Sequence, residues 1–287
     1  MSYTSSKIDY VQPVSVVIPT LGGESLKGTI EQINRGKIVP KEILICIPEE
    51  DAYKTENFSF SNVRVVKTRC KGQVAQRAEG LKLTSGFYVM QLDDDIELLP
   101  ETLGRLISAL SKLGRGNVIG PVYKEKNTGR IHHKIESGIS GFGRNVFYSL
   151  ICGANWGSKR MGTFTPSGHG FGVDPDSCNT DLFLTQYLPG GCVLSFKEDL
   201  VEEDFFPFTG KAYCEDFIHS HLRTLRGIKH WVLLAAECLL EEVELDFNPV
   251  ARKSSARARG FFIKLRGHSM ARFTIYEAVS RVRYFFR

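Results

Sequence analysis

One stretch constrains the fold of this chain more than any other: a run of strand-forming residues that ends in three consecutive carboxylates. The run reads Phe87-Tyr88-Val89-Met90-Gln91-Leu92-Asp93-Asp94-Asp95, and Pro100 follows it before a helical pattern begins. Aromatic and β-branched residues favour a buried strand. Because adjacent like charges repel, we expect a divalent cation to supply the opposing charge, and oxygen ligands suit Mg²⁺ or Mn²⁺. An acidic turn that only caps the next helix is the alternative.

Strand-like and helix-like patterns alternate along the first part of the chain. Helical spacing of apolar residues begins after Gly23, again after Gly72, and again after Pro100. This alternation predicts a parallel sheet with helices on both faces. In such sheets ligands bind beyond the carboxyl ends of the strands, which is where the three carboxylates lie. The predicted strands are Val14–Ile18, Glu42–Ile47, Val63–Val66, Phe87–Leu92 and Asn117–Tyr123.

The second half of the chain is less regular. Residues 138–188 are rich in Gly, Ser, Asn, His and aromatics and show little periodicity, which predicts a binding loop or lid, or a disordered segment. Regular structure is expected to return with a strand over Gly190–Phe196, a helix opened by Glu215-Asp216 and a last core strand over His230–Ala235.

The charge of the chain is unevenly distributed. From Ala251 onward there are ten Lys/Arg and one acid, so this tail carries +9 while the preceding 250 residues carry −4. Such a tail favours an anionic surface as partner. As a helix it forms an apolar stripe with arginines on its flanks, which is typical of a helix lying on an anionic membrane. Packing of the stripe onto the preceding domain is the alternative. The stripe is Ile275, Val279, Val282 and Phe286, flanked by Arg272, Arg283 and Arg287.

Two further features concern location. Residues 1–12 contain no apolar signal region, and the longest apolar run, Trp231–Ala236, is far shorter than the ~20 residues that span a membrane. The seven cysteines are scattered without zinc-ligand spacing, which is typical of free thiols in a reducing compartment. The sequence therefore predicts a cytoplasmic protein, peripheral at the cytoplasmic face of a membrane.

Four segments in this order resemble the GT-A glycosyltransferases, most closely family 2, whose members are inverting and use nucleotide sugars. Together they span about residues 14–235. They are Val16-Val17-Ile18-Pro19-Thr20, Gln76-Arg77-Ala78-Glu79-Gly80, Leu92-Asp93-Asp94-Asp95 with Pro100, and Pro189-Gly190-Gly191-Cys192 leading to Glu215-Asp216 and Arg223.

The resemblance implies an α/β GT-A fold, with a Rossmann-like, mostly parallel sheet and helices on both faces. It implies a catalytic domain over residues 1–245, with a nucleotide-binding half over about 14–123 and an acceptor half over about 124–245. The basic amphipathic segment would cover 246–287. The implied activity is metal-assisted transfer of a sugar from a nucleotide-diphosphate donor, with a UDP-sugar favoured, to a hydroxyl of a glycan or lipid-linked acceptor, as in polysaccharide biosynthesis.

The resemblance also implies roles for individual residues. Asp95 would bind Mn²⁺ or Mg²⁺, and Asp93 would hold the ribose or a metal-bound water. Asp216 would be the general base that takes the proton of the acceptor hydroxyl, although an acidic pair at a helix start can also be simple helix decoration. The remaining nucleotide-sugar contacts would come from Thr20, Glu49, Arg77, Asp94, Gly191, Glu215 and Arg223. For Arg77 and Arg223, a place on the helix surface is the alternative.

The chain departs from the family pattern at two places. The second strand ends in Ile47-Pro48-Glu49-Glu50-Asp51 in place of the usual Asp-Asp-Gly-Ser, and Ala78 replaces the usual Asn. A sugar-phosphate nucleotidylyltransferase shares the architecture, but it needs an arginine in the first loop, and Thr20-Leu21-Gly22-Gly23-Glu24 has none. A nucleic-acid- or membrane-binding scaffold with an inactive GT-A domain is the remaining alternative; nucleic-acid binding would leave the acidic turn without a purpose.

Overall fold

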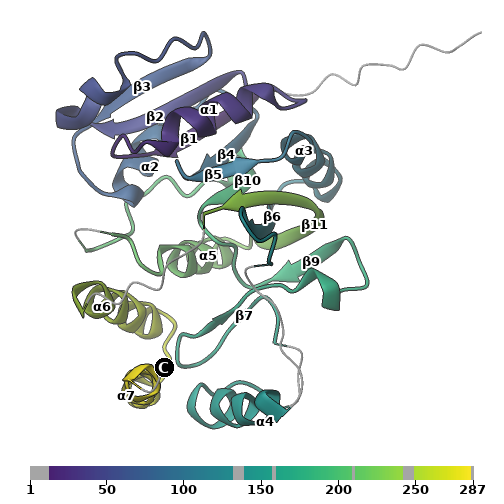
Figure 1. The fold of residues 1–287 in the computed structure, drawn as a ribbon, viewed down its shortest axis with the longest axis vertical. Helices are drawn as coiled ribbons and strands as arrows, with labels where there is room; N and C mark the ends of the chain where they lie inside the picture. The colour runs from purple at the N-terminus through teal and green to yellow at the C-terminus, as the bar shows by residue number, and fades with distance from the viewer. Residues whose placement is uncertain (1–12, 132–138, 157–159, 209–210, 242–248, 286–287) are drawn as a thin grey trace, which may run out of the picture.

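The computed structural model describes residues 13–131, 139–156, 160–208, 211–241 and 249–285. Its centre is a nine-stranded sheet with the order β3-β2-β1-β4-β10-β6-β11-β5, and β9 pairs with β11 (Figure 1). The first four strands of this order are mutually parallel. They are β1 (Val14–Pro19), β2 (Glu42–Pro48), β3 (Val63–Thr68) and β4 (Tyr88–Leu92). The predicted parallel sheet is confirmed, and these four predicted strands agree with the structure to within two residues.

The other strands make the sheet mixed. β10 (Cys192–Phe196) lies antiparallel between β4 and β6 (Asn117–Glu125), with Cys192 opposite Leu92. β11 (Lys229–Leu240) is parallel to β6 and is longer than the predicted strand. Two antiparallel strands that the sequence did not indicate, β5 (Ile96–Leu98) and β9 (Leu182–Thr185), pair with β11.

Helices cover both faces of the sheet, as predicted. The apolar sides of α1 (Ser25–Arg35) and α3 (Thr102–Leu113) share one buried cluster with Val16 and Ile18 of β1. Val17 points to the opposite face, where it packs with Leu81 of α2 (Gln73–Lys82). Alternate residues of β1 thus face opposite helical layers, which accounts for its uninterrupted hydrophobic sequence.

Residues 138–188 contain more regular structure than the sequence predicted. They form α4 (Ile139–Val146), a π-helix at Phe147–Ile151, and the short hairpin of β7 (Thr163–Phe164) and β8 (Gly170–Phe171), before β9 joins the main sheet. In its described part this segment is thus ordered rather than structureless, and aromatic side chains contact one another where periodicity is absent. Short 3₁₀ helices lie at Glu49–Thr55, Pro175–Ser177 and Lys197–Asp199.

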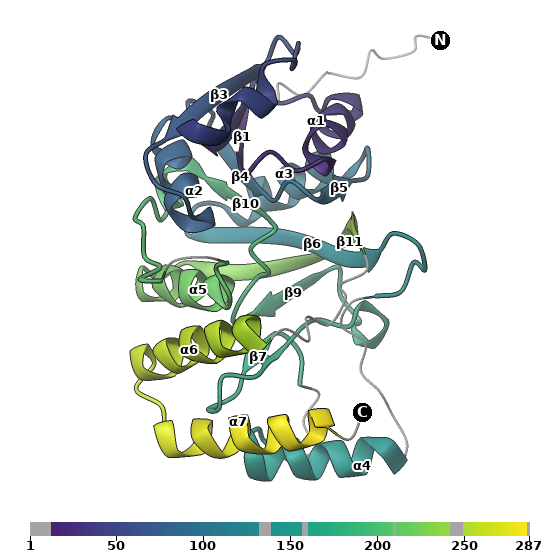
Figure 2. The same ribbon diagram turned by 60° about the vertical axis from the view of Figure 1, so that its left-hand side comes forward.

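The C-terminal segment forms two helices that pack on the rest of the protein. α6 (Pro249–Leu265) lies against α5 (Glu215–Leu225), and α7 (Met270–Phe285) lies against α6 and the π-helix (Figure 2). Phe262 of α6 and Phe273 and Tyr276 of α7 are buried together. The helical state of the tail is confirmed.

The predicted apolar stripe of the tail is not the side of α7 that packs on the rest of the protein. Phe273 and Tyr276 form the buried side of α7, whereas Ile275 of the stripe is 53% exposed. The side chains of Val282 and Arg283, the residues Phe286 and Arg287, and the boundary expected at 245 lie outside the described residues. Within the described part of the chain, no helix is long and apolar enough to cross a membrane.

Candidate active site

A cavity of about 800 Å³ lies beyond the carboxyl ends of β1 and β4. Its walls are the turn after β1, which includes Thr20, the first turn of α2 with Gln73 and Gln76, and the carboxylate turn after β4. This is the edge of the sheet at which the sequence places the three aspartates. The cavity therefore brings Thr20 together with Asp93, Asp94 and Asp95.

The three aspartates have different surroundings. Asp95 is exposed toward the cavity, whereas Asp93 and Asp94 are half-buried. Asp94 accepts a hydrogen bond from the Thr20 hydroxyl, and its backbone carbonyl accepts one from the hydroxyl of Thr29 at 2.9 Å. Asp94 thus fastens the turn after β1 to the turn after β4, and leaves Asp95 facing the cavity.

The carboxylates are held in an electrostatically unfavourable arrangement. Burial raises the pKa of Asp94, and the neighbouring charge of Asp93 raises it further. Burial also raises the pKa of Asp95, with added contributions from Asp93 and Asp94. A cation would relieve this repulsion, so the donor set fits a divalent metal ion. Among the described residues no three His, Cys, Asp or Glu side chains converge as a ready-made ligand set, so the remaining ligands would be phosphate oxygens and water.

Arg77 connects the carboxylate turn with α5. Its guanidinium is 2% exposed, and its two terminal nitrogens donate hydrogen bonds to Glu215 Oε1 at 2.9 Å and to Asp93 Oδ1 at 3.1 Å. Burial lowers the pKa of Arg77, but Glu215 and Asp93 outweigh burial and raise it, so the arginine stays charged. Gln73 Nε2 donates to the same Asp93 oxygen at 2.9 Å. Asp93 is thereby oriented by α2 and, through Arg77, by the first turn of α5.

The two glycines before β10 permit this close packing. A Cβ atom at Gly190 would lie 2.2 Å from Glu215 Oε1, and one at Gly191 would lie 3.2 Å from Asp93 Oδ2. The Gly191 carbonyl also accepts a hydrogen bond from the Asp93 amide at 2.9 Å. Gly191 therefore positions Asp93, and Gly190 gives Glu215 the space to reach Arg77.

Asp216 follows Glu215 in the first turn of α5 and is half-buried. Burial raises the pKa of its carboxyl to about 7, with a further contribution from the neighbouring Glu215. Its Oδ1 accepts a hydrogen bond from the amide of Phe217 at 2.9 Å. A carboxylate that titrates near neutral pH is suited to accept a proton.

Behind the first turn of α5 lies a buried group of basic side chains. Arg223 is 1% exposed and His219 is 2% exposed, so both are interior groups and the surface alternative for Arg223 does not apply. Burial lowers the pKa of Arg223 to about 9, and the charge of Glu215 opposes this shift. Burial holds the pKa of His219 well below its usual range, which leaves the imidazole neutral. Glu215 therefore pairs with the buried Arg77, and its charge also acts on the buried Arg223.

Several predicted site residues are absent from the described lining of the cavity: Arg77, Gly191, Glu215, Asp216, Arg223 and Glu49. Arg77 and Gly191 contact Asp93, which does line it, whereas Glu49 is exposed on the 3₁₀ helix after β2. The acid of that turn that is tied to the cavity is Asp51, whose carboxylate pairs with Lys71 at 3.2 Å, and Lys71 lines the cavity.

Two polar residues at the site, Gln76 and Lys211, were not predicted as site residues. Gln76 donates to the backbone carbonyls of Thr20 and Cys46, both at 2.6 Å, and so fixes the ends of β1 and β2. Lys211 lines the cavity, and its charge lowers the pKa of Asp95 against the larger effect of burial. Glutamines on helices and isolated lysines are so common that the sequence could not single them out.

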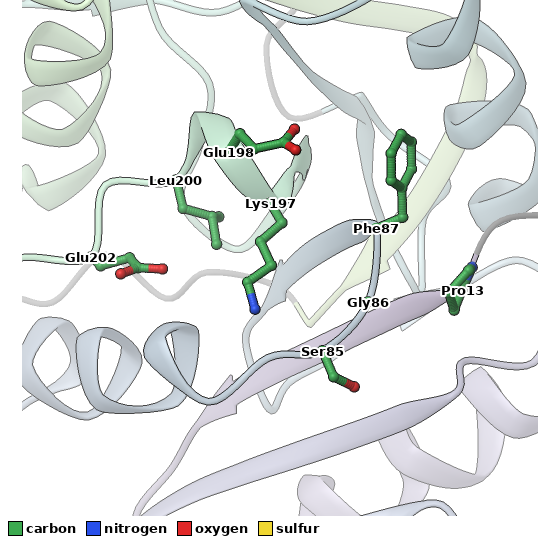
Figure 3. A pocket seen from close by; sticks show the side chains of 8 residues that line it. All are labelled: Pro13, Ser85, Gly86, Phe87, Lys197, Glu198, Leu200 and Glu202. Carbon is green, nitrogen blue, oxygen red and sulfur yellow. The ribbon is translucent and has the colours of Figure 1, made fainter.

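A second cavity, of about 680 Å³, opens at the other edge of the sheet (Figure 3). It lies where β1 and β4 begin, beside Pro13, Ser85 and Phe87, and Lys197 points across it. Lys197 donates a hydrogen bond to the Thr84 carbonyl, and Glu198 pairs with Arg115 at 3.0 Å. Lys197 and Glu198 thus already have partners, whereas the carboxylates of the first cavity repel one another. This difference favours the carboxylate-lined cavity as the active site.

Comparison with known proteins agrees with the geometry. The sequence model of Glycosyl transferase family 2 matches residues 15–172, more than half of the chain. A solved structure of GalNAc-T7 with UDP, GalNAc and Mn²⁺ has a similar fold, with a TM-score of 0.57 and 17% sequence identity. The match covers 83% of this chain and 45% of that chain, so this chain spans less than half the length of that neighbour. No curated protein matches the sequence. With its carboxylate turn at the edge of a mostly parallel sheet, the chain is a GT-A glycosyltransferase and belongs to glycosyltransferase family 2.

Proposed function

We propose that this glycosyltransferase moves a sugar from a nucleotide-diphosphate donor, with a UDP-sugar favoured, to a hydroxyl of a glycan or lipid-linked acceptor, with inversion at the anomeric carbon. The observation that carries the proposal is the buried bridge from Asp93 through Arg77 to Glu215. It holds the carboxylate turn and the first turn of α5 in one fixed arrangement, so a donor and a base can be positioned together.

The diphosphate of the donor would lie in the cavity beside Asp95, and the nucleoside would extend toward Thr20 and the acids after β2. Asp93 and Asp95 would hold a divalent cation, which stabilises the negative charge of the leaving diphosphate. Asp216 would take the proton of the acceptor hydroxyl as its oxygen attacks the anomeric carbon. Gly191 and Arg77 hold Asp93 in position. Glu215 ties the first turn of α5 to Arg77, and Arg223 adds a buried positive charge behind that turn.

Removal of the metal ligand tests the donor site. We expect UDP to bind the wild-type protein in the presence of Mn²⁺ and to lose nearly all binding in EDTA or in Asp95→Ala, because the cation bridges carboxylate and diphosphate. Isothermal titration calorimetry with UDP, GDP and TDP measures the affinity for each nucleotide and shows which nucleobase the protein prefers.

The matched control is Glu198→Ala, which removes an exposed carboxylate at the other cavity and should leave UDP binding and its requirement for metal intact. If none of the three nucleotides binds the wild-type protein with Mn²⁺ present, the carboxylates serve as a helix cap and the donor site is wrong.

Contact with an anionic membrane is a further part of the proposal. Four large hydrophobic residues are exposed at the end of the molecule formed by α4, the π-helix and α7 (Figures 1 and 2). They are Phe142, Leu150, Trp156 and Ile275, between 53% and 69% exposed. Arg272, whose guanidinium donates to the Leu150 carbonyl at 3.0 Å, adds positive charge to the same end. Apolar side chains beside arginines suit a membrane that carries anionic lipids.

Placing charge at this end should reduce membrane binding. We expect Leu150→Glu with Ile275→Glu to lower cosedimentation with vesicles containing phosphatidylserine by about tenfold, since each change removes apolar contact and adds repulsion. Val39→Glu, at an equally exposed valine between α1 and β2, is the control. Equal sedimentation of the double variant and the wild type would exclude this end as the contact.

A further inference from the structure

Lys71 lines the part of the donor cavity that lies toward the acids after β2. It stands directly before the N-cap of α2, and it shares the lining with Thr20 and Leu21 of the turn after β1. The described lining holds one other lysine, Lys211, whose charge acts on Asp95 of the carboxylate turn. The two lysines therefore serve different parts of the cavity, and the one that faces the nucleoside is Lys71.

Both carboxylate oxygens of Asp51 already have lysine partners. Oδ1 accepts a hydrogen bond from Lys54 Nζ at 2.7 Å, and Oδ2 accepts one from Lys71 Nζ at 3.2 Å. Lys54 is fixed in turn, because it donates to the Leu21 carbonyl at 2.8 Å and packs on Gly22, where a Cβ atom would lie 2.6 Å from the lysine Cδ. The acid of this turn therefore holds lysines in place and does not offer a free acceptor to the nucleoside.

The ammonium of Lys71 is held by two carboxylates and keeps one donor free. It donates to Glu50 Oε1 and to Asp51 Oδ2, both at 3.2 Å. An ammonium has three N–H groups, so one remains after these two bonds. The hydrogen bonds to Asp51 and Glu50 raise the pKa of Lys71, so the nitrogen stays protonated. Because the side chain is 54% exposed and lines the cavity, its third N–H is available to a ligand.

The surroundings of Lys71 suit a flat ring with a polar edge. Leu21 is 46% exposed and offers an apolar surface in the same part of the cavity. The backbone carbonyls of Thr20 and Cys46 already accept hydrogen bonds from Gln76. A nucleobase can thus lie against Leu21 with its edge toward the ammonium.

The ammonium distinguishes between nucleobases by their edges. It donates hydrogen bonds and cannot accept them. Uracil and thymine present the oxygen O4 and guanine presents O6, whereas cytosine and adenine present an amino group at the corresponding position. That amino group is itself a donor, so it would face the ammonium without forming a hydrogen bond. The chemistry of Lys71 therefore favours a keto base over an amino base.

We propose that Lys71, held by Glu50 and Asp51, determines the nucleotide specificity of the donor site by donating a hydrogen bond to the keto oxygen of the nucleobase. The site then takes donors that contain uracil, thymine or guanine and rejects those that contain cytosine or adenine. The inference rests on the proposed function, because it concerns the base of the same donor. It replaces the contact expected from Glu49, which is exposed and absent from the described lining.

The test compares UDP with CDP, whose bases differ at position 4 and at the neighbouring N3, and with inorganic pyrophosphate, which has no base. Binding to the full-length protein is measured by calorimetry with Mn²⁺ present. We expect the wild type to bind UDP about tenfold more tightly than CDP, since one charge-assisted hydrogen bond separates them. Lys71→Met should weaken UDP binding by about tenfold and remove the preference for UDP over CDP, while pyrophosphate binding stays unchanged. Lys71→Arg, which keeps a charged donor, should retain the preference.

Lys211→Met is the matched control, because it removes the other lysine of the described lining and should leave the ratio of UDP to CDP affinity as it is. Loss of the preference in this control would make it a general effect of charge and would overturn the inference. A Lys71→Met variant that still prefers UDP also overturns it, and so does one that loses pyrophosphate binding, because Lys71 would then act on the phosphates.

The wild-type protein separates this inference from the proposed function. If it binds UDP and CDP equally, the specificity assigned to Lys71 is wrong while the donor site stands. If it binds neither UDP nor pyrophosphate with Mn²⁺ present, the donor site is wrong, and the proposed function and this inference fail together.

Discussion

Asp216→Asn is expected to lower the rate of sugar transfer by about 10²- to 10⁴-fold, the usual contribution of a general base. The asparagine keeps the size of the side chain and a hydrogen-bond acceptor for the amide of Phe217, but it cannot accept a proton. Transfer by the wild type should rise with pH through about 7, the pKa to which burial and Glu215 raise the carboxyl. Initial rates between pH 5.5 and 8.5, with donor binding measured beside them, check both statements.

The same substitution has a second readout in stability. Because the folded state holds the Asp216 proton more tightly than the unfolded chain, ionisation of Asp216 destabilises the fold as pH rises from 3.8 to about 7. Asp216→Asn removes this cost, so the variant should be more stable than the wild type above pH 7 and nearly equal to it below pH 4. Tm values at several pH values test this. A variant that keeps full activity would exclude Asp216 as the base.

Glu215→Gln is expected to destabilise the fold by about 3–5 kcal/mol, since removal of one partner leaves buried charge uncompensated. Glu215 pairs with Arg77, and its charge opposes the lowering of the pKa of Arg223; the two arginines are 2% and 1% exposed. Without Glu215, Arg77 keeps only the half-buried Asp93 as an ionic partner, and Arg223 loses a compensating negative charge. Urea unfolding followed by far-UV circular dichroism measures the loss as a change in the free energy of unfolding.

Two comparisons make the result specific. Glu31→Gln breaks an exposed pair with Arg35 and should cost about 0.5 kcal/mol or less. The double variant Arg223→Met with Glu215→Gln also removes one of the two buried arginines that interact with Glu215. It should therefore recover at least about 1 kcal/mol of the lost free energy of unfolding. If Glu215→Gln is no worse than Glu31→Gln, the buried bridge contributes nothing measurable to stability.

The sequence predicted the parts of the fold that depend on local pattern. Apolar runs such as Ile43–Ile47 predict strands, because a strand buried on both faces has a distinctive composition. The strand predicted over Glu42–Ile47 agrees with β2 to within one residue. β9 and the β7–β8 hairpin escaped prediction because they are short and depend on distant partners: β9 pairs with β11, and Phe164 of β7 contacts Phe217 of α5. The buried side of α7 escaped prediction for a related reason: Phe273 and Tyr276 have partners on the π-helix that the helix itself does not reveal.

The residues of the candidate site divide in the same way, into those that a local pattern reveals and those that depend on contacts distant in sequence. The three aspartates could be selected because adjacent like charges repel and need an opposing charge, and the Glu215-Asp216 pair through the resemblance to the family. That Arg77 bridges Asp93 and Glu215 depends on residues 16 and 138 positions away from it, and no local rule supplies such a contact. The arrangement of the C-terminal helices is also beyond local prediction: the sequence predicts a basic amphipathic helix, but the packing of α6 against α7 decides which of its arginines lie near one another.

The position of β10 has a consequence for how the protein is made. This strand separates β4 from β6 in the sheet, yet it comes about 70 residues after β6 in the chain. When β1 to β6 have left the ribosome, β10, which joins β4 to β6, has not yet been synthesised. Arg77 also still lacks its partner Glu215. The half of the sheet that binds the donor therefore cannot close until most of the acceptor half has been synthesised, so long-range closure should be the slow step of folding and the nascent amino-terminal half a natural client for chaperones.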